Sequence, residues 1–316
     1  MRILVTGANG FIGKVLCRTL TEKGYEVRGA VRSPEKIPVS RDLSWISVGD
    51  IGPETSWKEA LAGVDGVIHL AARVHQLRDA EENPLEVYRK VNTEGTKQLA
   101  ESSILAGVQR FIFLSTVKVN GEETGVKPFT ETDKVFSKDP YALSKWEAEQ
   151  TLGEIAWSAG WNLYIIRPPL VYGPGVGANF LQLLKWIDWG IPLPLKGIKN
   201  KRSMVYVGNL VDALISCLHS SKVVKETFLI SDGKDFSTAE WIRMIAQALG
   251  KKARLFSLPP LLLEVLGLIA GQSESVKRLT RSLAVDSQKI QKVLDWRPPF
   301  SAEEGIRETV RWYRSL

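Results

Sequence analysis

Cysteine and histidine, frequent ligands of protein metal sites, are scarce in this sequence. Cys17 and Cys217 are the only cysteines in 316 residues, which excludes a disulfide framework or a cysteine-rich metal centre. The three histidines, His69, His75 and His219, lack the HExxH spacing of a zinc site. We therefore assign no metal to the chain.

Long hydrophobic runs are also missing. The most apolar late segment, residues 258–270, is interrupted by two prolines, a glutamate and a glycine, and it is too short to span a bilayer. A buried or partner-facing helix explains this segment better than membrane contact does. Residues 2–5 resemble a strand rather than the apolar core of a signal peptide. With so few cysteines, these features predict a cytoplasmic protein without an integral membrane segment.

Charge of one sign is not concentrated along the chain. Lysine and arginine number 42 and aspartate and glutamate 35, and the resulting net charge of +7 suits an anionic ligand such as a phosphate. A nucleic-acid partner requires a dense basic patch, and because the positive residues are scattered, none is expected. The densest group is Lys196, Lys199, Lys201 and Arg202, which is either a solvated loop or a phosphate contact.

The chain does contain a regular alternation of strand and helix patterns. Short apolar runs at residues 2–5, 26–31, 43–48, 66–70, 111–114 and 163–166 are separated by helical patterns at 11–23, 57–62, 85–106 and 140–159. Such alternation produces right-handed crossovers and a parallel sheet covered on both faces. Residues 228–230 later return to the sheet. We predict a large nucleotide-binding domain of residues 1–170 plus about 204–231, and a smaller, partly interleaved domain of about 171–203 and 232–316.

Three glycines mark the junction of the first strand and the first helix. Gly7 permits a tight turn, Gly10 lets the backbone approach a pyrophosphate, and Gly13 allows the helix to pack closely on the strand. The helix N-terminus then faces the anion. An ordinary tight turn is the alternative, but the strand–helix pattern downstream favours a dinucleotide site. We expect cofactor contacts from Gly7, Asn9, Gly10, Phe11, Ile12 and Gly13.

The end of the second strand bears on which dinucleotide binds. An acidic residue there would bind the adenosine ribose and repel a 2′-phosphate, but this strand ends at Arg32 without an acid. A guanidinium can pair with a phosphate through two hydrogen bonds. NADP(H) is therefore favoured over NAD, which stays possible because Arg32 can instead stack on adenine or be solvated.

Tyr141 and Lys145 are spaced four residues apart in a helical pattern. Such residues share one helix face, so the phenol and the ammonium point into the same cleft. A free tyrosine has a pKa of about 10 and is a poor base at neutral pH. A nearby lysine and an oxidised nicotinamide favour the phenolate, so Tyr141 can exchange a proton with a substrate hydroxyl. We also expect Lys145 to hold the nicotinamide ribose.

The segments TGANGFIG and YALSK resemble the extended short-chain dehydrogenases/reductases, the branch that contains the NAD-dependent epimerases and dehydratases of nucleotide sugars. The resemblance covers essentially the whole chain. It implies an α/β fold, namely a Rossmann doubly wound parallel sheet with a smaller, partly interleaved C-terminal substrate domain. It also implies that Thr116 forms a hydrogen bond with the reacting oxygen. Further cofactor residues implied by it are Asp50, Ile51, Leu70, Ala71, Ala72, Asn92, Ser115 and Pro168.

The same resemblance implies a diphosphate site in the C-terminal part. Arg202 matches the family arginine that grips the nucleotide phosphate, and Arg278 or Arg281 is a candidate second anchor, of which we select Arg281. Many family members carry an asparagine at Leu170, and we expect Asn179 to supply an amide to the diphosphate instead. These residues would bind a UDP-sugar.

Two departures from the family pattern bear on the sugar. Lys118 and Asn120 stand where sugar epimerases usually carry a small hydroxyl residue and a tyrosine. We expect both to contact the substrate, although a salt bridge explains Lys118 equally well. With them, the segments HLAARVH, STVKVNG and RPPLVYGPG resemble a subgroup tied to bacterial surface-polysaccharide synthesis. That subgroup contains reductases of UDP-4-keto-6-deoxy-N-acetylglucosamine and proteins labelled 4-epimerases.

Three functions follow from this resemblance. The first is C4 keto-reduction of a UDP-4-keto-(6-deoxy)-N-acetylhexosamine with NADPH, which the missing acid after the second strand favours. The second is 4-epimerisation of a UDP-hexose or UDP-N-acetylhexosamine with a retained NAD. The third, a dinucleotide-binding sensor without chemistry, is disfavoured by the Tyr141/Lys145 pair. By analogy with the family we expect a homodimer formed through the helices at 85–106 and 140–159.

Overall fold

The computed structural model describes residues 1–33, 43–74, 83–135, 137–220, 225–259, 262, 263, 265, 268 and 273–316. His75 lies outside these ranges, as does part of the apolar segment 258–270.

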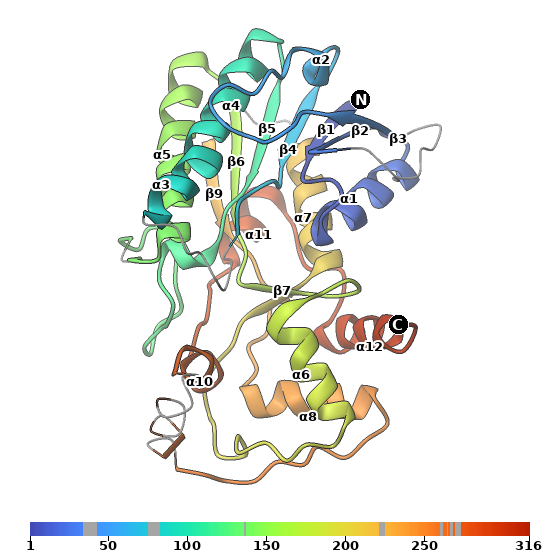
Figure 1. The fold of residues 1–316 in the computed structure, drawn as a ribbon, viewed down its shortest axis with the longest axis vertical. Helices are drawn as coiled ribbons and strands as arrows, with labels where there is room; N and C mark the ends of the chain where they lie inside the picture. Colours follow the sequence, from blue (N-terminus) through green and yellow to red (C-terminus); the bar gives the residue numbers. More distant parts are fainter. Residues whose placement is uncertain are drawn as a thin grey trace.

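A seven-stranded parallel sheet forms the upper part of the molecule in Figure 1. Its strands stand in the order β3 (Leu43–Ser47), β2 (Glu26–Val31), β1 (Arg2–Thr6), β4 (Gly66–His69), β5 (Arg110–Leu114), β6 (Asn162–Arg167) and β9 (Lys225–Leu229). The chain order reverses between β1 and β4, and ligands of doubly wound sheets bind at the carboxyl ends of the strands at such a point. The predicted fold class is therefore confirmed.

Alternate side chains of each central strand enter two separate cores, one on each face of the sheet. Ile3 and Val5 belong to the core that includes α1 (Phe11–Glu22) and α7 (Val207–His219). Leu4 belongs to the core that includes α4 (Gly95–Leu105) and α5 (Pro140–Ala159). Because both faces are covered, the strands are continuous apolar runs.

The predicted single helix at 85–106 is wrong in detail. The structure has α3 (Pro84–Tyr88), then a π-helical turn η1 (Arg89–Glu94), and only then α4. The wider turn contains Asn92, whose buried side chain bonds to neighbouring elements. Short π-helical insertions of this kind are frequent at functional sites.

The C-terminal part lies below the sheet in Figure 1 and has a small parallel sheet of its own. That sheet pairs β7 (Leu170–Tyr172) with β8 (Met204–Tyr206). The helices and short elements not yet named are α2 (Lys58–Leu61), η2 (Val117–Val119), α6 (Ala178–Asp188), α8 (Thr238–Ala248), α10 (Ser273–Thr280), α11 (Gln288–Leu294) and α12 (Ala302–Tyr313). After β7 and α6 the chain returns upward through α7 and β9, as the interleaved arrangement requires. The domain boundaries stated above stay a prediction.

The described residues hold neither a membrane span nor a metal cluster. No described helix has both the length and the apolarity to cross a bilayer. Within the same ranges, no three side chains of histidine, cysteine, aspartate or glutamate gather as a metal site would require. The cytoplasmic location stays a prediction.

Candidate active site

The glycine turn between β1 and α1 is packed too closely for side chains. A Cβ at Gly7 would lie 2.9 Å from the Ala71 backbone nitrogen, and Gly7 has a φ of +65°. A Cβ at Gly13 would lie 2.2 Å from the Gly7 carbonyl oxygen. Gly10 is the N-cap residue of α1, and among the described residues no side chain caps the start of this helix. The free backbone N–H groups of this helix start fit a dinucleotide pyrophosphate.

A buried histidine fixes the strand ends around this turn. His69 Nδ1 lies 2.6 Å from Thr6 Oγ1, and His69 Nε2 lies 2.9 Å from Thr96 Oγ1 on α4. Thr6 Oγ1 also accepts a hydrogen bond from the Ala71 N–H at 3.1 Å. Burial, and then the Lys145 charge, lower the pKa of His69 to about 3, so it stays neutral. These bonds hold the backbone of Leu70 and Ala71 beside the glycine turn. The sequence analysis expected both residues to contact the cofactor.

Lys145 and Tyr141 lie on the same face of α5. The Lys145 side chain is 1% exposed, and its ammonium lies 3.9 Å from the centre of the Phe113 ring. Burial lowers the pKa of Lys145 to about 7, against the opposing effect of Glu149. Burial, then Asp139 and Tyr88, raise the pKa of Tyr141 above its usual value. The Phe113 ring that Lys145 contacts also stacks on His69 with ring centres 5.7 Å apart, and His69 bonds to Thr6, so Lys145 lies near the glycine turn.

Asn92 bridges the loop after β4 and helix α5. Its Nδ2 donates to Ser144 Oγ and to the Arg73 carbonyl, both at 3.0 Å, and its Oδ1 accepts from the Arg73 N–H at 2.8 Å. Ser144 in turn donates to the Tyr141 carbonyl at 2.7 Å. Asn92 is thus bonded to α5 between Tyr141 and Lys145, and its cofactor role stays a prediction.

A closed network of polar groups lies one helical turn further along α5. Glu149 accepts from Ser115 Oγ and, at 3.0 and 3.2 Å, from Arg167 Nε. Arg167 Nη1 donates to Asn120 Oδ1 at 3.0 Å, and Asn120 Nδ2 donates to the Thr130 carbonyl at 2.8 Å. The Arg167 and Glu149 side chains are 4% and 2% exposed. The side chains of Ser115 and Asn120 are held in this network, and their predicted cofactor and substrate contacts stay predictions.

Thr116 follows Ser115 at the end of β5 and keeps part of its surface exposed. Its hydroxyl oxygen accepts from the Lys118 N–H at 3.3 Å. The next residue, Val117, donates its N–H to the Pro168 carbonyl at 2.9 Å, which joins this segment to the end of β6. The proposed bond from Thr116 to the substrate stays a prediction.

Lys118 forms ion pairs at the start of the catalytic helix. Its ammonium contacts the Asp139 carboxylate and, at 3.1 Å, that of Glu122. Asp139 caps α5 by accepting from the Tyr141 N–H at 2.9 Å. Burial alone would raise the pKa of Asp139, but Lys118 and the helix N–H groups bring it below its usual value. The structure therefore agrees with the salt-bridge alternative for Lys118. The expected contact of Lys118 with the substrate stays a prediction.

Arg202 is a strong candidate for an anion contact. Burial, and then the charge of Arg278, lower the pKa of Arg202 to about 10. Among the described residues no carboxylate pairs with Arg202. Two guanidinium groups close enough to influence each other fit a diphosphate. This geometry favours Arg278 as the second anchor.

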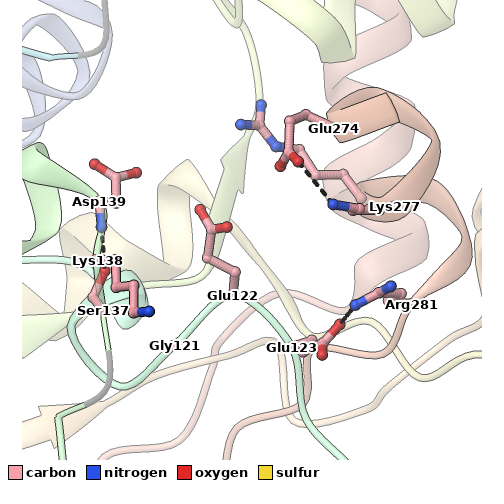
Figure 2. Close-up of a pocket in the computed structure, with 10 residues that line it drawn as sticks. Gly121, Glu122, Glu123, Ser137, Lys138, Asp139, Glu274, Lys277 and Arg281 are labelled. Atoms are coloured by element: carbon pink, nitrogen blue, oxygen red, sulfur yellow. Dashed lines mark hydrogen bonds and ion pairs between the residues drawn. The ribbon is translucent and has the colours of Figure 1, made fainter. Parts of the chain in front are cut away.

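Arg281 lies in a cavity of about 330 Å³ between α10 and the loop after η2 (Figure 2). Its guanidinium pairs with Glu123, and its backbone carbonyl accepts from Asn200 Nδ2 at 2.9 Å. Figure 2 draws this pair and the Lys277–Glu274 pair beside it. Arg281 thus contacts an acidic residue, while the exposed Asn179 lies in the first turn of α6. The diphosphate roles of Arg281 and Asn179 stay predictions.

Arg32 has an acidic partner that strand-end reasoning missed. Its Nε lies 2.7 Å from Asp50 Oδ1, and both side chains are about four-fifths exposed (80% and 83%). Asp50 follows β3, which pairs with β2, so the sheet brings the two residues together. An acid is therefore present near the end of β2, although it comes from the segment after β3. This weakens the argument for NADP(H) that rested on a missing acid. Ile51 packs near Gly95 at the start of α4.

Comparison with known proteins now identifies the family. The family described as NAD dependent epimerase/dehydratase matches residues 3–231. The chain belongs to this family. The resemblance predicted from the two motifs is therefore confirmed, and the chain is an NAD-dependent enzyme of the short-chain dehydrogenase/reductase type.

Several proteins similar to this chain are named as 4-epimerases of sugars that carry a diphosphate. A protein named UDP-glucose 4-epimerase from Vibrio cholerae is 43% identical, with 98% of this chain and 94% of that protein covered. An N-acetyl-α-D-glucosaminyl-diphospho-ditrans,octacis-undecaprenol 4-epimerase from Escherichia coli O157:H7 is 28% identical, with 98% and 94% covered. The solved UDP-glucose 4-epimerase of Thermotoga maritima with UDP-glucose has a TM-score of 0.78 at 25% identity, covering 100% and 99%.

Three residues that the sequence analysis did not select support the candidate site. Asp139 caps α5, and its position directly before Pro140 is a recognisable helix-start signal. Glu149 continues the four-residue spacing of Tyr141 and Lys145, which was a usable signal. Arg167 gave no signal of its own, since its partner lies 18 positions earlier.

Proposed function

We propose that this enzyme is a 4-epimerase of UDP-hexoses or UDP-N-acetylhexosamines that retains its NAD. The observation that carries the proposal is the pairing of Tyr141 with the buried Lys145 on one face of α5, near the glycine turn. It occurs in a chain 43% identical to a 4-epimerase over nearly its full length. The motif-based preference for C4 keto-reduction has no specific support among these relatives, whereas the epimerase alternative does.

The chemistry assigned to the pair is proton transfer at the sugar C4 hydroxyl. When NAD is bound, its nicotinamide accepts the C4 hydride and later returns it. Tyr141 takes the hydroxyl proton as C4 is oxidised and gives it back when C4 is reduced from the other face. Because burial raises the pKa of Tyr141, the phenolate needs a nearby cation, and Lys145 on the same helix face provides it. Thr116 is the proposed partner of the C4 oxygen.

The nucleotide diphosphate is assigned to Arg202 and Arg278. The lowered pKa of Arg202 reflects burial and a second guanidinium nearby. A diphosphate placed between them would compensate both charges and form charge-assisted hydrogen bonds. This contact anchors the substrate without discriminating among sugars.

NAD rather than NADP(H) is the proposed dinucleotide. An epimerase cycle has no net redox change, so an exchangeable NADPH is not required. The Asp50 carboxylate beside Arg32 supports this choice, because a carboxylate near the adenosine ribose would repel a 2′-phosphate. The homodimer remains a prediction, which light scattering of the purified protein tests.

The decisive experiment starts with the protein as purified. Its dinucleotide is released by denaturation and measured, and the native protein is mixed with UDP-glucose, UDP-galactose or their N-acetylamino counterparts without added cofactor. Retained NAD with interconversion at C4 supports the proposal. Consumption of added NADPH by a UDP-4-keto sugar, with no interconversion, would replace it by keto-reduction. Absence of both activities from a folded, NAD-loaded protein would leave the sensor hypothesis.

A further inference from the structure

Two segments lie side by side at the end of the molecule farthest from the seven-stranded sheet (Figure 1). They are residues 185–201, after most of α6, and residues 251–257, after α8. Leu193 N–H donates to the Arg254 carbonyl at 2.8 Å, and Phe256 N–H donates to the Leu193 carbonyl at 3.1 Å. Lys196 N–H donates to the Phe256 carbonyl at 3.0 Å. We call these paired segments the basic tip.

The basic tip carries almost the whole net charge of the protein. Its two segments hold seven of the 42 lysines and arginines but only one of the 35 acidic residues, a net charge of +6 out of +7. Six of these cations are exposed: Lys196, Lys199, Lys201, Lys251, Lys252 and Arg254. Within the described ranges Lys251 alone among the seven pairs with a carboxylate, that of Asp188. The rest of the chain is close to neutral, so the molecule is strongly polarised.

Large apolar side chains project from the same segments. Trp189 is 66% exposed, and Trp186, Ile191 and Phe256 are each more than one third exposed. Their neighbours Leu184 and Ile187 are buried in the core, so the exposed tryptophans belong to the outer side of the tip. Tryptophan beside lysine and arginine is the composition that favours the boundary between lipid headgroups and water.

We propose that the basic tip docks on the surface of an anionic lipid bilayer. The lysines and Arg254 would attract anionic headgroups, and Trp189, Ile191 and Phe256 would enter the headgroup boundary. A nucleic acid would use the cations but gain little from an exposed isoleucine. The proposal is independent of the proposed reaction, because the reactive pair lies on α5 beside the sheet.

The expected strength follows from the number of charges. Each lysine near an anionic surface strengthens partitioning by about fivefold at moderate ionic strength, so reversal of three lysines weakens it by about 100-fold or more. Added salt screens the exposed charges and should weaken binding in the same direction.

The test is sedimentation of the full-length protein with vesicles. Phosphatidylcholine vesicles containing about one third phosphatidylglycerol should bind the protein, and pure phosphatidylcholine vesicles should bind it far less. Lys196→Glu/Lys199→Glu/Lys252→Glu and, separately, Trp189→Ser/Phe256→Ser should lose binding. The matched control is Lys23→Glu/Lys58→Glu/Lys97→Glu, which changes the net charge equally on exposed positions outside the tip. Circular dichroism and retained dinucleotide show whether each variant folds.

Several results would overturn the proposal. These are failure of the wild-type protein to bind anionic vesicles, or equal losses in the tip variants and in the control. A dimer dissolved by Trp189→Ser/Phe256→Ser, without vesicle binding, would assign the tip to a second copy of the chain. Binding of single- or double-stranded nucleic acid that only the tip variants lose would assign it to that polymer instead.

Discussion

Two polar clusters on α5, one helical turn apart, differ in how far their polar groups are satisfied. Around Glu149, the carboxylate is hydrogen-bonded to Ser115 and Arg167, and Arg167 also bonds to Asn120. Around Lys145, the ammonium lies over an aromatic ring, and its pKa falls to about 7 because burial is not fully compensated. Buried polar groups are normally paired. The closed cluster is therefore scaffold, and the open one is where a ligand is expected.

The largest effect should come from the open cluster. Tyr141→Phe removes the proton-transferring hydroxyl, so turnover of the UDP-sugar should fall by about 10²–10⁴-fold while the dinucleotide still binds. Steady-state rates and release of bound dinucleotide measure the two parts. Tyr313→Phe, which loses a hydroxyl bonded to Asp188 far from the crevice, serves as the control. Turnover that survives in Tyr141→Phe would refute the assigned chemistry.

The closed cluster should respond in stability rather than in chemistry. Glu149→Gln leaves Arg167 charged, buried and without its carboxylate, and should lower the free energy of unfolding by about 3–5 kcal/mol. Glu147→Gln on the same helix breaks the more exposed pair with Arg89 and should cost about 0–1 kcal/mol. Urea unfolding compares the two variants. If both variants lost the same free energy of unfolding, burial would not explain a difference in strength between the two ion pairs.

Lys145→Met should stabilise the dinucleotide-free protein while abolishing turnover, because it removes a buried charge. The folded pKa of Lys145 is about 7 and its ordinary value is 10.5. Between these values the unfolded chain binds the extra proton, so wild-type stability rises with pH in this window. The advantage of the variant should be about 1–4 kcal/mol at pH 7 and shrink toward pH 10.5. Unfolding across that range measures it, and the exposed Lys97→Met is the control. If the difference in free energy of unfolding between Lys145→Met and the wild type did not change with pH, the lowered pKa of Lys145 would be contradicted.

The smallest effect is expected at the exposed Arg32–Asp50 pair. Arg32→Ala should change the dissociation constant for NAD by less than about threefold, since exposed pairs contribute little. Fluorescence titration with NAD and NADP measures both constants. A tenfold loss confined to NADP would instead restore the NADP(H) preference.

Local patterns were sufficient to predict the fold, and they placed Tyr141 and Lys145 on one helix face. The strands are uninterrupted apolar runs because helices cover both faces, and Gly7 and Gly13 stand where no side chain fits. Tyr141 and Lys145 share a face because a helix repeats about every four residues. The same local reasoning overlooked the π-helical turn at Asn92, which depends on contacts with α5 and the strand-end loop.

Contacts between distant segments decided the rest. Ser115 and Asn120 carry the same polar groups as a ligand contact would, yet Glu149 and Arg167 hold them in the scaffold. Lys118 forms an ion pair with Asp139, 21 positions later. Arg32 forms an ion pair with Asp50 because β2 pairs with β3. The amino-acid order thus determined which residue types stand at which element ends, since those signals are local. Only the folded chain decided which polar groups are left for a ligand, because each pairing depends on residues that packing brings together.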